Sequence, residues 1–187
     1  MIASDKFAKF DVSIVVPALD MEDYMPELLN SVESQTLLPR EIVIVDSSET
    51  NRTAEIVAKW VGIVPISYHN VDLALPGRAR NIGVKESKGE WIAFLDCKTI
   101  PVPDWLEKCA ITAQKNEVFF VCGLTLFEAD TSFKQILRAA SIGCVAHRTL
   151  VGSLVLKESF LETGGFVLNV RSGEDMEWLE RVNSLGY

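Results

Sequence analysis

The chain has 187 residues, of which 48% are hydrophobic and 24% charged, so it is long enough to bury a core and has a globular composition. Its formal net charge of −8 argues against a nucleic-acid-binding protein, because such proteins normally present a basic face. No apolar run approaches the ~20 residues that cross a bilayer, and the four cysteines form no CxxC pair, so neither a membrane span nor a zinc site is predicted.

The first half of the sequence alternates short apolar runs with segments of helical spacing. Pro17 is predicted to stop the first strand, Asp20 to cap the helix that follows, and Asp46 to end the second strand. In chain order we expect a loose leader over 1–10, a strand over 12–16, a helix over 21–35, a strand over 41–45, a helix over 53–60, a strand over 65–69, a helix over 76–87 and a strand over 91–95.

The second half is less regularly patterned. Asp104 is expected to cap a helix, residues 118–126 are β-prone, and the stretch up to Leu150 receives no assignment. A helix is expected over 133–140, a strand over 154–156, and helices over 157–163 and 174–185. The alternation predicts an α/β fold with right-handed crossovers and a mostly parallel sheet. We expect one domain over 1–187 with a truncated C-terminal end, because the last helix is followed directly by Gly186-Tyr187.

Three of the predicted strands end in residues suited to binding a ligand. The apolar run 91–95 ends on Asp96, the second strand ends on Asp46, and the first is followed by residues 17–20. Parallel strands bring their C-terminal ends to one edge, which is where open α/β sheets bind ligands. A single Asp at a strand end more often caps a turn or helix, but the set of three favours a shared cleft.

Residues 76–81 place Arg78, Arg80 and Asn81 at the start of a predicted helix. Cations there oppose the helix dipole, and a bound anion would relieve that conflict, so the pattern favours an anion site over a merely basic, solvated helix start. Residues 173–175 (Gly-Glu-Asp) begin the last helix, and taken alone they are explained by the preference for acids in a first helical turn.

These pieces, in this order, resemble the inverting nucleotide-sugar glycosyltransferases of family two. That family has the GT-A fold, a Rossmann-like three-layer α/β/α sandwich around a mostly parallel central sheet. Each piece alone is weakly specific, whereas the ordered set spans nearly the whole chain. The matching segments are VSIVVP at 12–17, EIVIVDSS at 41–48, PGRARNIG at 76–83, GEWIAFLD at 89–96, GGF at 164–166 and GEDMEW at 173–178.

The resemblance implies a nucleoside-diphosphate sugar as donor and assigns residues to it. Pro17 and Asp46 would line the pocket for the base and ribose. Arg78 and Asn81 would reach the edge of a uracil-like base or the phosphates. Asp96 would hold the ribose, or a metal ion on the diphosphate.

The resemblance also assigns the acceptor side. Asp175 matches the general base that takes the proton of the acceptor hydroxyl while its oxygen attacks the anomeric carbon with inversion. Glu174 precedes it as the family pattern requires, and Trp178 is expected either to stack on an acceptor sugar or to pack inward. The acceptor would be a saccharide, a lipid-linked molecule or another hydroxyl compound, as in polysaccharide or glycoconjugate biosynthesis of the bacterial type.

One departure from the family pattern concerns the metal. The family has Asp-x-Asp where this chain has Asp96-Cys97-Lys98, so an ammonium group replaces a carboxylate that normally binds Mg²⁺ or Mn²⁺. The sequence leaves three outcomes: Lys98 neutralises the diphosphate itself, a metal binds weakly through Asp96, or catalysis is lost. Turnover that is independent of a metal, or only weakly dependent on one, is favoured. The third corresponds to a non-catalytic module that binds nucleotide sugars, which the retained Asp175 argues against.

Other classes fit less well. A phosphatase of the haloacid dehalogenase type would carry Asp-x-Asp-x-Thr near its start, and a dinucleotide-dependent dehydrogenase would show GxGxxG after the first strand. The start of the chain lacks an export signal, so the expected location is the cytoplasm or the inner face of the membrane. Membrane contact is expected only through residues beyond Tyr187.

Overall fold

The computed structural model describes residues 10–129, 131–141, 143 and 145–185. The predicted leader therefore lies almost entirely outside the described residues. In chain order the elements are β1 (Val12–Ala18), the 3₁₀ helix η1 (Glu22–Tyr24), α2 (Met25–Glu33), β2 (Glu41–Asp46), α3 (Arg52–Lys59), β3 (Ile66–Asn70), α4 (Pro76–Glu86), β4 (Trp91–Phe94), α5 (Trp105–Asn116), β5 (Phe120–Thr125), α6 (Ser132–Ser141), β6 (His147–Leu156), α7 (Lys157–Glu162) and α8 (Glu174–Ser184).

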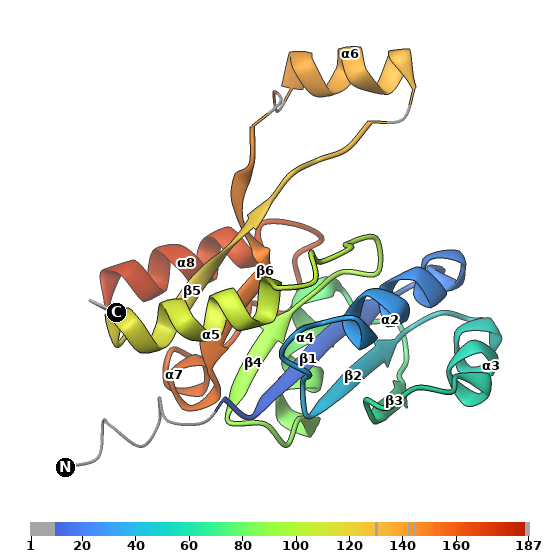
Figure 1. The fold of residues 1–187 in the computed structure, drawn as a ribbon, viewed down its shortest axis with the longest axis horizontal. Helices are drawn as coiled ribbons and strands as arrows, with labels where there is room; N and C mark the ends of the chain where they lie inside the picture. Colours follow the sequence, from blue (N-terminus) through green and yellow to red (C-terminus); the bar gives the residue numbers. More distant parts are fainter. Residues whose placement is uncertain (1–9, 130, 142, 144, 186–187) are drawn as a thin grey trace.

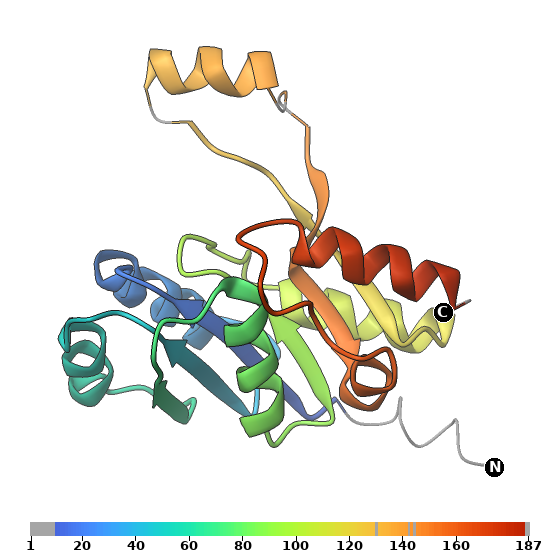
Figure 2. The same ribbon diagram turned by 180° about the vertical axis from the view of Figure 1, so that it is seen from behind.

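The six strands form one sheet in the order β3-β2-β1-β4-β6-β5. Strands β1 to β4 pair in parallel, whereas β6 runs antiparallel to both of its neighbours, β4 and β5. Figures 1 and 2 show helices on both faces, with α2 and α5 on one and α4, α7 and α8 on the other. The predicted three-layer α/β/α sandwich with a mostly parallel sheet is confirmed.

Each face of the sheet has its own apolar core, because consecutive strand residues point to opposite sides. On one face Ile14, Ile44 and Leu95 pack with α2 and α5. On the other, Val15 and Phe94 pack with α4, α7 and α8. Both faces are covered, which explains why the parallel strands read as continuous apolar runs in the sequence.

The first strand extends past the predicted stop. Pro17 lies within β1 and pairs in register with Val45 of β2. Proline is tolerated because alternate residues of a parallel strand bond to opposite neighbours, and residue 17 faces β4. The pairing of β4 with β1 ends at Val15 and Phe94, before residue 17 is reached. Pro17 therefore costs the sheet no backbone hydrogen bond. Pro17 carbonyl oxygen instead accepts from the thiol of Cys97 at 3.4 Å.

The predicted cap at Asp20 is wrong. Asp20 has a positive φ of 51°, and its backbone N–H donates to Ser48 Oγ at 2.8 Å. The helix starts later than predicted because η1 comes first, and Tyr24 occupies the N-cap position of α2. Asp104 does occupy the N-cap position of α5, but its carboxylate pairs with Lys108 at 2.6 Å instead of capping.

A close approach of α4 to the sheet sets the position of the candidate site. Gly83 lies against Val15 of β1, where an added Cβ would be only 2.4 Å from Val15 Cγ1. Any larger residue at this position would push α4 outward. None of the helices in the described residues combines the length and the apolar composition that crossing a bilayer requires.

Candidate active site

Asp46 at the end of β2 organises two loops. Its side chain is fully buried. One carboxylate oxygen accepts from the Ser48 backbone N–H at 2.9 Å and from the Ser48 hydroxyl at 2.5 Å, and the other accepts from the Tyr68 hydroxyl at 2.8 Å. Burial, reinforced by this bond and the charge of Asp46, raises the pKa of Tyr68 to about 12. Because Ser48 also receives the backbone N–H of Asp20, Asp46 fixes the loops that follow both β1 and β2.

Strands β2 and β4 lie on either side of β1 and run parallel to it, so Asp46 and Asp96 lie at the same edge of the sheet. Cys97 is buried beside Asp96. Burial, then the charges of Asp96 and Asp46, raise the pKa of its thiol to about 12. The convergence of the two carboxylates on one cleft and the contact of Asp46 with a nucleoside stay predictions.

Arg80 of α4 joins the end of β4 to the start of α8. Its guanidinium donates to Asp96 Oδ1 at 2.8 Å and to Glu174 Oε1 at 2.6 Å. The side chains of Arg80 and Glu174 are each only 7% exposed, whereas that of Asp96 is 43% exposed. A single buried cation thus bridges two acids that are far apart in sequence, and one oxygen of Asp96 remains open to a ligand.

The other predicted donor residues of α4 lie differently. Arg78 is exposed and donates to the Leu73 carbonyl at 3.3 Å, so it stays at the surface beside the loop before α4. Asn81 bonds the backbone of Phe166 twice, through its amide nitrogen at 2.8 Å and its oxygen at 2.9 Å. The amide therefore holds the Gly-Gly-Phe turn, and its predicted contact with the donor is not part of this geometry.

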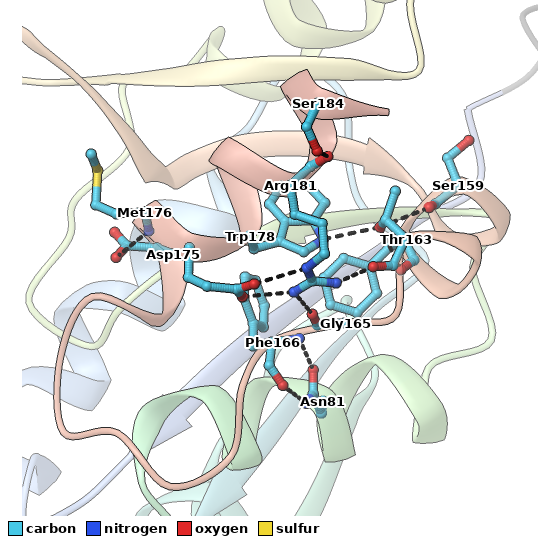
Figure 3. Close-up of polar contacts among 12 residues, drawn as sticks. Asn81, Ser159, Thr163, Gly165, Phe166, Asp175, Met176, Trp178, Arg181 and Ser184 are labelled. Atoms are coloured by element: carbon cyan, nitrogen blue, oxygen red, sulfur yellow. Dashed lines mark hydrogen bonds and ion pairs between the residues drawn. The ribbon is translucent and has the colours of Figure 1, made fainter. Parts of the chain in front are cut away.

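The start of α8 is brought to α4 by a second close contact. An added Cβ at Gly77 would lie 2.5 Å from the Val167 carbonyl oxygen and 3.3 Å from Glu174 Cβ. Asp175 follows directly and is half-buried, with Oδ1 accepting from the Met176 N–H at 2.9 Å. In Figure 3 its carboxylate points away from the cluster around Arg181.

Of the two arrangements expected for Trp178, the structure shows inward packing and not an exposed ring available to an acceptor sugar. The residue is 1% exposed and lies among Phe120, Phe160 and Phe166. Its indole N–H donates to the Thr163 hydroxyl at 3.0 Å. Glu174, also placed on the acceptor side by the resemblance, is turned into the protein by Arg80.

Arg181 ties α8 to the turn that follows α7 (Figure 3). Its guanidinium donates to the carbonyl oxygens of Thr163 and Gly165 and forms two bonds, at 2.7 and 2.9 Å, with the carboxylate of Glu177. The first residues of α8, including Asp175, are thereby held against the turn that Asn81 also holds.

This clamp should make the protein sensitive to acid. The bond from Arg181 lowers the pKa of Glu177 below its ordinary value. A carboxylate with a lowered pKa stabilises the folded state above its unfolded pKa, and this contribution is lost as the pH falls through the lowered value. We expect Glu177→Gln to melt below the wild type at pH 7, with the difference shrinking as the pH falls through the lowered pKa of Glu177. Glu180→Gln, an exposed acid on the same helix, should show no such gap in the melting temperature at either pH.

The residues at the position of the family's metal motif do not fit a Mg²⁺ or Mn²⁺ held by the protein alone. Asp96 already shares one oxygen with Arg80. Lys98 is exposed, and its Nζ lies 4.9 Å from the centroid of the Tyr24 ring, beside η1. Across the described residues no group of three or more His, Cys, Asp or Glu side chains is arranged to hold a metal ion. With one shared carboxylate as the protein ligand, a divalent cation would take its other oxygen ligands from the diphosphate of the donor and from water.

A cavity of about 640 Å³ lies beside the end of α8 and the start of β5, among residues that include Phe120, Trp178 and Leu185. Neither Asp96 nor Asp175 lines this cavity. The candidate site is therefore the edge of the sheet at the C-terminal ends of the parallel strands. This sandwich, with acids at the ends of β2 and β4 and at the start of a late helix, has the architecture of GT-A glycosyltransferases.

The chain belongs to the family described as Glycosyl transferase family 2, whose model matches residues 13–168. It is 27% identical over 194 aligned residues to the glycosyltransferase AglE of Haloferax volcanii, covering 94% of this chain and 62% of that protein. It is 35% identical over 89 residues to the poly(ribitol-phosphate) β-N-acetylglucosaminyltransferase TarS of Staphylococcus aureus, which is 45% of this chain and 15% of TarS. The chain thus spans about three fifths of the length of AglE.

Solved structures show the same fold. The crystal structure of S. aureus TarS in complex with UDP-GlcNAc superposes with a TM-score of 0.69 at 20% identity, over 92% of this chain and 53% of that one. The mannosyltransferase PcManGT of Pyrobaculum calidifontis, in complex with GDP-Man and Mn²⁺, gives a TM-score of 0.72 at 21% identity, over 97% of this chain and 54% of that one. At these identities the likeness establishes the fold alone.

Proposed function

We propose that this chain transfers a sugar from a nucleoside-diphosphate sugar to an acceptor hydroxyl with inversion, and that Asp175 is the general base. The observation that supports this most directly is the buried bridge from Asp96 through Arg80 to Glu174. It links the strand end expected to face the donor to the residue preceding Asp175. The family to which the chain belongs and its structural neighbours agree with this activity.

The roles follow from the charge and exposure of each side chain. Asp175 is half-buried at the start of α8 and would take the proton of the acceptor hydroxyl as its oxygen attacks the anomeric carbon. Arg80 is already neutralised by two acids, so it is not the cation that meets the departing diphosphate. Lys98 is exposed at the end of β4 and would offset that negative charge directly.

Transfer would then need no divalent metal. An ammonium group supplies the charge at the point where the family pattern has a metal-binding carboxylate. The acceptor would be a saccharide, a lipid-linked molecule or another hydroxyl compound. We place the reaction in the reducing cytoplasm, which agrees with the free thiols of Cys97, Cys109 and Cys122.

A nucleotide panel tests this proposal. UDP, GDP, dTDP and CDP are added in separate melts, each with EDTA and with Mn²⁺. We expect one nucleotide to raise the melting temperature, because a ligand present at 100 times its Kd stabilises the folded state by about 2.7 kcal/mol. The shift should be equal in EDTA and Mn²⁺. If no nucleotide moves the melting temperature, the assignment of the cleft is wrong.

Two variants sharpen the result. Lys98→Asp should abolish the shift in EDTA and restore it with Mn²⁺, since it recreates a pair of carboxylates. Lys115→Asp makes the same charge change on an exposed residue of α5 and should behave like the wild type. The second candidate function is a non-catalytic module that binds nucleotide sugars, and it stays a candidate because Lys98 replaces a carboxylate. It would be favoured if the protein bound a nucleotide but released no nucleoside diphosphate from the matching nucleotide sugar.

A further inference from the structure

The connection between β5 and β6, residues 126–146, forms an arm that carries α6. Figures 1 and 2, seen from opposite sides, both show α6 standing clear of the sheet and of the helices that cover it. The arm is long for a connection between two neighbouring strands. The transfer chemistry proposed above assigns it no role.

The helix α6 is strongly amphipathic. Phe133, Ile136, Leu137 and Ala140 recur at spacings of three and four residues, so they share one face. That face is open to solvent, with Phe133 70% exposed, Ile136 67% and Leu137 50%. Leu126 and Phe127 on the arm below α6 are also exposed, so apolar side chains are concentrated along this projection.

The helix α6 differs in charge from the rest of the protein. Residues 132–141 hold Lys134 and Arg138 and no Asp or Glu, although Glu128 and Asp130 precede them on the arm and the whole chain has a net charge of −8. Lys134 and Arg138 are one helical turn apart, so they lie on the same side of α6, away from its apolar face. An apolar face opposed by cations on the polar face is the composition of helices that lie in the surface of anionic membranes.

The size of α6 favours a lipid surface over a protein partner. A helix of ten residues is about 15 Å long and about 10 Å wide. Such an area is far below the roughly 800 Å² per partner that a stable protein interface buries. Binding to a bilayer surface has no such minimum area, because its strength scales with the apolar area inserted plus the attraction of cations to anionic lipids.

We propose that α6 docks this protein on an anionic lipid surface, with the face of Phe133, Ile136 and Leu137 at the boundary of headgroups and acyl chains. Lys134 lies at the level of the lipid phosphates, whereas the guanidinium of Arg138 donates to the Phe127 carbonyl oxygen of the arm at 2.9 Å. The proposal concerns the arm alone and does not depend on the transfer reaction.

Co-sedimentation with vesicles tests it. We expect the protein to pellet with vesicles of phosphatidylcholine and phosphatidylglycerol, and much less with phosphatidylcholine alone. Phe133→Asp/Ile136→Asp should weaken partitioning at least about tenfold, because two apolar anchors are lost. Lys134→Glu should weaken binding to the anionic vesicles only. The control Val61→Asp/Leu73→Asp alters residues that are 96% and 71% exposed on the body and should bind like the wild type.

Folding and assembly are measured in parallel. All variants should keep the melting temperature of the wild type within a few degrees, since the altered side chains are exposed. The proposal is overturned if the wild type fails to pellet with anionic vesicles, if it pellets equally with both kinds, or if Phe133→Asp/Ile136→Asp pellets as well as the control. It is also overturned if light scattering shows a dimer that this variant dissociates, because a second copy would then cover α6.

Discussion

Replacing Asp175 by Asn is expected to lower the rate of nucleoside diphosphate release from the bound nucleotide sugar by about 10²–10⁴-fold, the usual loss when a general base is removed. The amide keeps the size of the carboxylate but cannot take the proton of the attacking hydroxyl. The measurement is release of nucleoside diphosphate from the sugar donor whose nucleotide stabilises the protein, with water or a sugar alcohol as acceptor.

Binding should survive this change. Asp175 projects from the start of α8, and its one hydrogen bond in the structure is to the neighbouring N–H of Met176, so the melting temperature with and without nucleotide should stay close to the wild-type values. Glu180→Gln removes an exposed carboxylate from the same helix and should leave the rate unchanged. A fully active Asp175→Asn protein would remove this residue from the chemistry.

Replacing Arg80 by Met should damage both stability and turnover. The change leaves the carboxylate of Glu174, which is 7% exposed, buried without its cation. Breaking a buried pair in this way typically costs about 3–5 kcal/mol of the free energy of unfolding. Turnover should fall as well, because Asp96 loses the bond that orients it and the start of α8 loses its link to α4. Urea unfolding measures the free energy of unfolding, and the release of nucleoside diphosphate measures turnover.

Two further variants separate this effect from a general loss of an arginine. Arg80→Met/Glu174→Gln removes the uncompensated charge and should recover part of the lost stability without recovering the rate. Arg40→Met breaks a surface pair with Asp11, in which the arginine side chain is 47% exposed, and should cost less than about 1 kcal/mol. Equal losses for Arg80→Met and Arg40→Met would contradict the importance of the buried bridge.

The architecture was predictable because the parallel strands are covered on both faces. Their apolar runs mark β1, β2 and β4, and the helices between them show a clear helical period. Most of β6 escaped prediction, since only its last three residues were assigned to a strand. Its first residues include the exposed Arg148, and the buried Gly152 has no side chain, so neither continuous hydrophobicity nor regular alternation identifies the strand.

The site was predictable at the strand ends and less so on the helices. Asp46 and Asp96 lie at the same edge because the strands that carry them are parallel. On α4, Arg78 is exposed, whereas the residues next to it in the sequence face the protein. The sequence does not show which side of that helix packs against the sheet. Arg80 was visible in the same motif, yet its bridge depends on Glu174, 94 residues away, which no local pattern connects to it.

The place of β6 in the sheet also dictates an order of assembly. Strand β5 is synthesised first, but its place lies beyond β6, so it has no neighbour in the sheet until residues 147–156 leave the ribosome. The four parallel strands that carry Asp46 and Asp96 meet no such delay. A nascent chain can therefore form the loops that follow β1, β2 and β4 early, whereas α8, which bears Asp175, is synthesised only after β6.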